Sequence, residues 1–261
     1  MMSDWFHDLP LVWMAVVVFG FTYVLAGAIH VVVHALAVGE RARAFKSVSP
    51  GMLPPLGIVF GLFVGFTAAQ VWSDSGNASA AVDREASALR SVVLLAASFP
   101  GESENHLRAL VANYIAEAKA QEWPLMARRA ITLTIVPHAL FEALQFTLSL
   151  QPFGPGQQIA QREITNALEN AMDARRQRLT ISQLQVSPIK WGCLYLQAVC
   201  ALIAIAFVHS DNRLASLLTM MLFATGAAAA VLLIAATDRP FIGEISVSPN
   251  SLLQVLPAPG S

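Results

Sequence analysis

Charge is scarce throughout this 261-residue sequence. Only 13% of the residues are Asp, Glu, Lys or Arg, and the formal net charge is −1, whereas ordinary soluble domains carry about 25% charged residues. Without a strongly basic balance the chain has no evident surface for nucleic acid, so no nucleic-acid partner is expected. The composition, which is 56% hydrophobic, indicates instead that much of the chain avoids water.

Metal-binding and catalytic motifs are absent as well. The two cysteines, Cys193 and Cys200, lie seven residues apart in one apolar stretch, which is typical of small hydrophobes on a helix face rather than of a disulfide or metal site. The sequence has no Gly-rich phosphate loop, no His-Glu-x-x-His and no Gly-x-Ser-x-Gly, the patterns that position phosphates, zinc and a nucleophilic serine. We therefore expect no enzyme activity, no cofactor and no metal ion.

Four long segments contain no Asp, Glu, Lys or Arg at all. They are 31, 27, 20 and 24 residues long, at positions 9–39, 47–73, 191–210 and 214–237. A helix needs about 20 apolar residues to cross a bilayer core, so these segments predict four transmembrane spans. The first is interpreted as a retained span, because no Lys or Arg precedes it and its apolar run exceeds the roughly 7–15 residues of a signal peptide.

The segment between the second and third spans has a different character. It holds 10 Lys/Arg and 11 Asp/Glu, and its apolar residues recur at helical spacing, as in Leu107, Leu110 and Val111. The pattern predicts that a helix continues from span 2 to about residue 97, followed by helices near 103–121, 125–150 and 157–183. The apolar run 130–141 raises a fifth span, but Pro137 interrupts it, so we expect this run to pack within the middle domain.

These features predict an all-α fold: a four-span transmembrane helical protein with a helical extramembrane domain inserted between spans 2 and 3. The expected parts are a transmembrane hairpin at 1–73, the helical domain at 74–187, a second hairpin at 188–239 and a tail at 240–261.

Two groups of basic residues bear on the orientation of the protein in the membrane, and they favour opposite sides. Arg41, Arg43 and Lys46 follow span 1, whereas the N-terminal tail has no Lys or Arg, so the positive-inside rule leans toward a middle domain outside the cytoplasm. Basic residues on the domain side of span 3, Arg175 to Lys190, oppose this orientation.

A set of residues distributed along the chain resembles the bestrophin-like family of bacterial membrane proteins. In order they are Trp72, Glu85, Tyr114, Glu122-Trp123-Pro124, Arg175, Arg178, and Asp238 with Pro240, Phe241 and Gly243. The resemblance covers nearly the whole chain, and it implies a four-helix membrane protein of the bacterial cytoplasmic (inner) membrane. By analogy with bestrophins it also implies a homo-oligomer, with a pentamer suspected, that conducts inorganic anions and keeps its large domain in the cytoplasm. That side is opposite to the one favoured by the charges near span 1.

Span 2 carries the candidate pore. Gly57, Gly61 and Gly65 recur every four residues, a spacing that lets helix backbones approach closely in lipid. The opposite face carries four candidate pore-lining residues: Val59, Phe63, Phe66 and Gln70. They could form a hydrophobic constriction that gates by dewetting; alternatively, these side chains simply face lipid. The resemblance favours the pore, because the second helix lines bestrophin-type pores.

Other polar residues have structural interpretations that compete with functional ones. His30 and His34, one turn apart in span 1, could sense protons or contribute to a metal site, but imidazoles near the end of a span can also reach the interface. His138 and Glu142 share a helix face at a spacing too common to indicate a metal site.

For Glu122 we expect an ion pair with the basic cluster Arg175, Arg176 and Arg178, with Trp123 packed beneath. The alternative is that these arginines attract anions to a vestibule. Asp238 to Gly243 reads as a stop to span 4 that ties the tail to the middle domain.

The preferred function is a homo-oligomeric, bestrophin-like ion channel, anion-conducting by resemblance, with span 2 lining the pore. The missing intramembrane carboxylates argue against a proton- or sodium-coupled transporter. The alternative function is a non-conducting membrane scaffold or sensor whose middle domain binds a partner.

Overall fold

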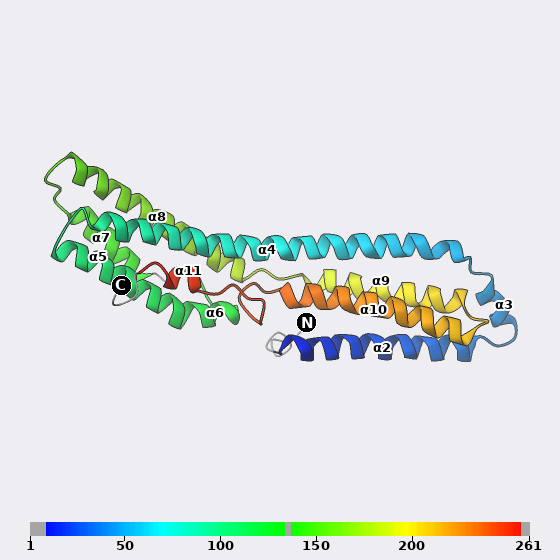
Figure 1. The fold of residues 1–261 in the computed structure, drawn as a ribbon. Helices are drawn as coiled ribbons and strands as arrows, with labels where there is room; N and C mark the ends of the chain where they lie inside the picture. The colour runs from blue at the N-terminus through cyan, green and yellow to red at the C-terminus, as the bar shows by residue number, and fades with distance from the viewer. Residues whose placement is uncertain (1–8, 134–136, 257–261) are drawn as a thin grey trace. The chain divides into compact units, whose positions relative to one another are not determined.

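The computed structural model describes residues 9–133 and 137–256, and these residues form helices and connecting segments with no strand among them (Figure 1). Four helices are long and apolar enough to cross a membrane: Leu11–Leu36, Pro50–Ala96, Pro188–Val208 and Arg213–Thr237. The prediction of an all-helical protein with four helices able to span a membrane is therefore confirmed for the described residues. The chain divides into two compact units. Unit 1 comprises residues 1–73, 185–238 and 243–245; unit 2 comprises 74–184, 239–242 and 246–261.

Unit 1 is built around three helices that lie side by side, α2 (Leu11–Leu36), α9 (Pro188–Val208) and α10 (Arg213–Thr237) (Figure 1). The Ser187 hydroxyl accepts a hydrogen bond from the Lys190 N–H at 3.4 Å and the Asn212 side chain accepts one from the Ala215 N–H at 3.0 Å, so both later helices begin at a capped end. The short helices α3 (Glu40–Lys46) and η1 (Pro50–Met52) connect α2 to α4.

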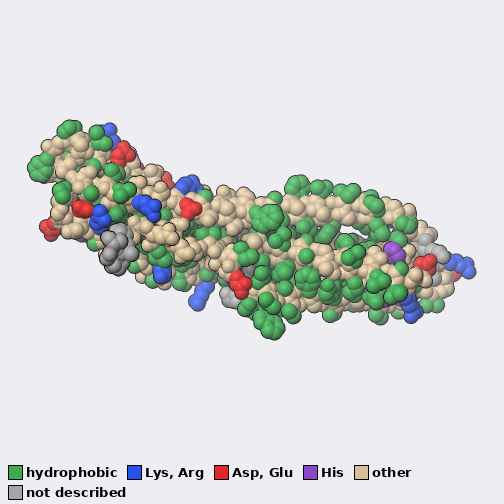
Figure 2. Space-filling view, viewed as in Figure 1, with side chains coloured by type: hydrophobic (Ala, Val, Ile, Leu, Met, Phe, Trp, Pro, Cys, Tyr) green, Lys and Arg blue, Asp and Glu red, His purple; other side chains and the backbone are tan. Residues whose placement is uncertain are grey.

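Helix α4 (Leu53–Ala96) is 44 residues long and contributes to both units. Pro54 and Pro55 lie in its first turn, where the missing N–H groups would have no helical partner. Figure 2 shows hydrophobic side chains covering unit 1, whereas charged side chains gather on unit 2 and near α3. The first half of α4 therefore shares the lipid-compatible surface of the other spans.

Unit 2 packs the second half of α4 with α5 (Glu102–Glu117), α7 (His138–Ser149) and α8 (Pro155–Ser182). A π-helical turn, η2 (Ala118–Glu122), and α6 (Trp123–Ala127) continue α5, and α11 (Asn250–Leu253) lies in the C-terminal tail. The tail residues Phe241, Leu252 and Val255 are buried in the same apolar core. The tail is thus tied to the middle domain, as the sequence predicted.

The expected helix over 125–150 is wrong. Helix α6 ends at Ala127, Arg129 has φ 52°, and the next helix begins only after Pro137. Proline lacks an N–H and disfavours helical geometry in the residue before it, which explains the late start of α7. Within the run 130–141, residues 134–136 lie outside the described part; Ile131, Ala139 and Leu140 are buried in the unit 2 core.

The Glu-Trp-Pro segment also differs from expectation, because it does not separate two helices. The chain stays helical from α5 through the π turn into α6, and Pro124 falls in the first turn of α6. A π turn shifts the register of the side chains that follow it. This shift places Glu122 in the interior of unit 2, where it pairs with two arginines of α8.

Candidate functional site

The first half of α4 contacts the rest of unit 1 along one narrow stripe. Phe60, Thr67 and Val71 are buried on this stripe, and Phe60 packs with residues of α2, α9 and α10. Val71 joins a smaller cluster with Ile234 of α10 and Val186. The spacing of these residues, about one or two turns apart, confines the contact to one side of the helix.

The remaining surface of this part of α4 is open. Phe66 is 73% exposed, and Val59 and Leu62 are each more than half exposed. A Cβ added at Gly57, Gly61 or Gly65 would meet no atom within 4 Å. Figure 2 shows an open space between α4 and the helices beside it. Within one chain, the glycine face and the Phe66 face of α4 therefore both lack a packing partner.

The four candidate pore residues occupy two environments. Val59 and Phe66 point away from the rest of the chain. Phe63 is partly buried against the core of unit 1, and the Gln70 amide oxygen accepts a hydrogen bond from the Lys190 ammonium. The structure thus leaves Val59 and Phe66 free on an outer face and holds Phe63 and Gln70 at its edge.

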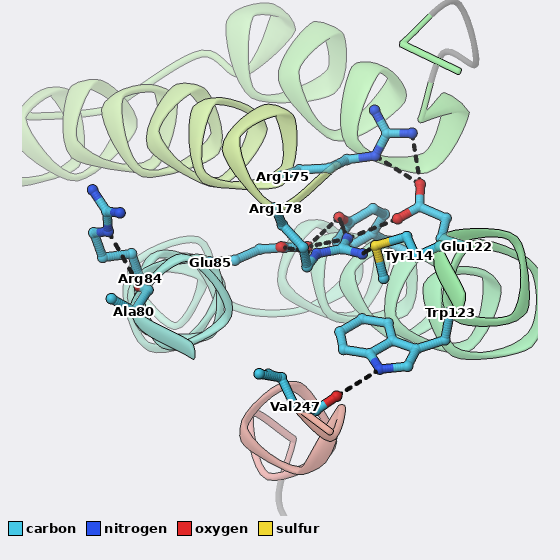
Figure 3. A network of polar contacts seen from close by, with 10 residues as sticks. Ala80, Arg84, Glu85, Tyr114, Glu122, Trp123, Arg175, Arg178 and Val247 are labelled. Atoms are coloured by element: carbon cyan, nitrogen blue, oxygen red, sulfur yellow. Dashed lines mark hydrogen bonds and ion pairs between the residues drawn. The ribbon is translucent and has the colours of Figure 1, made fainter. Parts of the chain in front are cut away.

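A buried cluster of charges lies in unit 2 (Figure 3). Arg178 of α8 donates to Glu85 of α4, from Nε to Oε2 at 2.7 Å, and to Glu122 of the π turn, from Nη2 to Oε2 at 2.7 Å. Arg175, one turn earlier, donates to Glu122 Oε1 at 2.7 Å. The Tyr114 hydroxyl of α5 donates to Glu85. Two arginines of α8 therefore balance the carboxylates of α4 and the π turn, and α5 adds a neutral hydroxyl.

Because this cluster is buried, its charged groups depend strongly on one another. Arg178 and Glu85 are fully buried, so each charge requires the other in a region of low dielectric constant. Burial disfavours the charged guanidinium, but Glu85, Tyr114 and Glu122 outweigh it and raise the pKa of Arg178. Burial, with the nearby Glu85 carboxylate, raises the pKa of the Tyr114 hydroxyl well above its usual value of 10.0. The cluster is thus built to hold one protonation state.

Trp123 connects this cluster to the tail. The Arg178 guanidinium carbon lies 4.6 Å from the centre of the Trp123 ring, a cation–π contact. The indole N–H donates to the Val247 carbonyl at 3.2 Å (Figure 3). Phe241 meets the ring edge-on with centroids 6.0 Å apart. The ion pair and the packed Trp123 expected from the sequence are therefore present. Arg176 is not part of the cluster, because it is exposed and pairs with Asp173.

The contacts of Glu85 and Tyr114 were not predicted from sequence reasoning. Glu85 lies one turn from Val82 and from Leu89, both buried, so it is a lone acid on an apolar helix face. Such a residue almost never stays buried without a partner. That pattern is the signal that could have identified it.

The remaining candidate residues have local roles. The rings of His30 and His34 lie 4.2 Å apart, and His34 Nδ1 lies 2.9 Å from the His30 carbonyl. His138 is exposed, and a carboxylate oxygen of Glu142 lies 3.9 Å from His106 Nε2.

The residues that close span 4 turn the chain into the tail. Asp238, buried at the end of α10, accepts a hydrogen bond from the Val186 N–H at 2.6 Å. Pro240 is buried, and Gly243 has φ 88°, which favours glycine. Trp72, at the end of the unit 1 part of α4, is 54% exposed.

A family model and two solved structures match this chain along most of its length. The family model described as a bestrophin-like domain matches residues 20–252. The structure is similar to the crystal structure of a mutant bacterial bestrophin homolog from Klebsiella pneumoniae, with a TM-score of 0.72 and 13% identity over 91% of this chain and 97% of that one. It is also similar to the crystal structure of a variant membrane protein, with a TM-score of 0.69 and 14% identity over 91% of this chain and 94% of that one. No curated protein matches the sequence. At these identities the structural likeness shows the fold alone.

Proposed function

Because the chain belongs to the bestrophin-like family, we propose that it is a homo-oligomeric ion channel, anion-conducting, whose pore is lined by the first half of α4. The observation that carries this proposal is the environment of that helix. It contacts its own chain along one stripe and leaves both the Phe66 face and the glycine face open.

The two open faces suit two different neighbours. Gly61 and Phe66 are five residues apart, which at 3.6 residues per turn separates them by roughly 140° around the helix. The glycine face allows the backbone of a helix from another copy to approach closely in lipid. The face with Val59 and Phe66 would then form an apolar constriction around a central axis, of the kind that gates by dewetting.

An oligomer would give a neighbour to both open faces of α4, the glycine face and the Phe66 face. A helix placed between its own chain, an adjacent copy and a water-filled axis has three distinct sides. We take a pentamer from the bestrophin resemblance as the working oligomer. The site needs no catalytic group, cofactor or metal.

The test is conduction by the purified protein in liposomes and planar bilayers. Wild-type protein is expected to pass ions, and Phe66→Ala is expected to raise the single-channel conductance by widening the constriction. The matched control is Leu222→Ala, since Leu222 on α10 is 76% exposed and would face lipid. Equal conductance of Phe66→Ala, Leu222→Ala and wild type would remove α4 from the pore. A wild type that passes no ion at any voltage or pH would favour a scaffold or sensor that binds a partner through unit 2.

The proposed location is the bacterial inner membrane, with the loop that carries Arg41 and Arg43 in the cytoplasm and unit 2 outside it. Labelling of single cysteines with a membrane-impermeant maleimide in intact cells tests the orientation. Gln145→Cys, exposed on α7, is expected to react and Ser47→Cys to be protected. The reverse pattern would establish the orientation that the resemblance to bestrophins implies.

A further inference from the structure

A lysine lies at the edge of the proposed pore face. Lys190, in the first turn of α9, donates a hydrogen bond from its ammonium to the Gln70 amide oxygen on α4. Both side chains are partly buried and both belong to unit 1. The bond draws a positive charge onto a stretch of α4 that has no charged residue of its own between Leu53 and Ser73.

The register of α4 places this charge on the same side as the proposed constriction. Gln70 follows Phe66 by four residues and Val59 by eleven, which is about one turn and about three turns of helix. The three residues therefore lie on one side, with Gln70 at the end where span 2 leaves unit 1. An ion moving along the Val59–Phe66 face would pass the Lys190 ammonium.

Within the described part of the chain, the positive charge of Lys190 is not cancelled by a carboxylate in an ion pair. Among the residues that the structure describes, no ion pair involves Lys190, and its partner Gln70 is neutral. An amide oxygen can orient an ammonium without neutralising it, since lysine has three donor hydrogens and needs no charged acceptor. Asp74, the next charged residue along α4, follows Gln70 by one turn and belongs to unit 2.

We propose that Lys190, oriented by Gln70, is the residue that makes this channel prefer anions. The inference rests on the proposed function, because it requires that α4 line a pore. In an oligomer each copy would contribute one ammonium, and rings of Lys or Arg select anions by attracting them and repelling cations. The attraction acts across a narrow, partly apolar passage, where it is stronger than in bulk water.

The experiment measures the anion-to-cation permeability ratio from reversal potentials in a potassium chloride gradient. Lys190→Gln removes the charge and keeps a hydrogen-bonding side chain; it is expected to lower the ratio by roughly fivefold. Lys190→Arg is expected to keep the ratio near that of wild type. Gln70→Glu retains the lysine but pairs it with a carboxylate, and it is expected to lower the ratio as well. The matched control is Lys119→Gln, at an exposed position of the π turn, which is expected to leave the ratio unchanged.

A purely structural role for the Lys190–Gln70 bond would give a different pattern. A Lys190→Gln channel that conducts with the wild-type ratio would overturn the inference while leaving the proposed channel intact. Equal shifts in Lys190→Arg and Lys190→Gln would also overturn it, because charge would then not be the cause. Absence of conduction in wild-type protein would overturn the proposed function itself and, with it, this role of Lys190.

Discussion

Arg178 places a full positive charge where solvent does not reach it. Its guanidinium contacts Glu85, Glu122, Tyr114 and the sulfur of Met126. Without Arg178 the buried Glu85 carboxylate loses its cationic partner, whereas Glu122 keeps Arg175; removing one partner of a buried ion pair typically costs about 3–5 kcal/mol. We therefore expect Arg178→Met to lower the free energy of unfolding by about 3–5 kcal/mol, measured by urea unfolding in detergent followed by circular dichroism.

Arg176 provides the matched control on the same helix. Its side chain is 66% exposed and pairs only with Asp173 one turn away, and exposed pairs of this kind contribute about 0–1 kcal/mol. Arg176→Met should therefore unfold close to wild type. If Arg178→Met were as stable as Arg176→Met, the cluster would not be a main source of the stability of unit 2.

Tyr114 gives the cluster a pH dependence of known sign. Burial and Glu85 raise its pKa, so the folded state holds the phenolic proton more tightly than the unfolded state. Its contribution to stability is therefore complete below about pH 10, the ordinary tyrosine value, and is lost as pH rises toward the folded pKa.

Tyr114→Phe isolates this contribution. The variant removes one of the two donors to Glu85 Oε1, the other being Arg178 Nη2 at 3.0 Å. Because the lost hydrogen bond is to a charged group, Tyr114→Phe should be less stable than wild type by about 1.5–3 kcal/mol at neutral pH. The difference should shrink above about pH 10, as measured by unfolding at several pH values. A difference that stayed constant or grew on the alkaline side would show that the Tyr114 proton is not held by the fold.

At the level of helices, a substitution at a glycine of α4 should change the assembly of the oligomer without changing the fold of one chain. A Cβ added at Gly61 would meet no atom within 4 Å beyond the adjoining part of its own helix, so Gly61→Leu should leave the fold of one chain intact. In the oligomer the same side chain would hold adjacent helices apart. We expect Gly61→Leu to shift the detergent-solubilised protein to smaller assemblies, measured by mass photometry.

Gly20 on α2 is the matched position, since it is also exposed and also has open space around its Cβ. Gly20→Leu should leave the assembly unchanged. An intact oligomer in Gly61→Leu would mean that the glycine face lies against lipid rather than against another copy.

The sequence predicted the spans well because the bilayer constrains them strongly. Helix α9 (Pro188–Val208) covers nearly all of the uncharged segment at 191–210, since an uncharged run between a proline and a polar loop allows little else. The end of the helix at Ala127 was missed because the apolar residues that follow it suit either a continuous helix or a buried irregular segment. Tertiary packing decides between the two, and periodicity does not record it.

The same limit applies to single faces within α4. Phe63 and Phe66 are three residues apart and chemically identical, yet one packs against its own chain and the other is 73% exposed. Only the positions of α2, α9 and α10 distinguish them. The ion pair of Glu122 was predictable because it joins opposite charges, whereas its geometry depends on a π turn that the sequence does not mark.

For the whole molecule, the arrangement of copies determines which residues meet across the axis. If α4 surrounds a central pore, Phe66 of one copy approaches Phe66 of the others, while Leu222 on α10 lies on the outside. Cysteines at these positions report the difference by disulfide formation. Cys193 and Cys200 are exposed, so both are first replaced by serine to prevent unrelated cross-links.

In that background Phe66→Cys should form inter-chain disulfides on mild oxidation in membranes, and Leu222→Cys should not. The geometric reason is that a disulfide requires Cα atoms about 4.4–6.8 Å apart, which residues near a narrow axis reach as the ring fluctuates and lipid-facing residues do not. Cross-linking through Leu222→Cys but not Phe66→Cys would place α10 at the centre and exclude a pore lined by α4. If cross-linking through Phe66→Cys stopped ion flux and a reducing agent restored it, ions would pass along the axis that Phe66 lines.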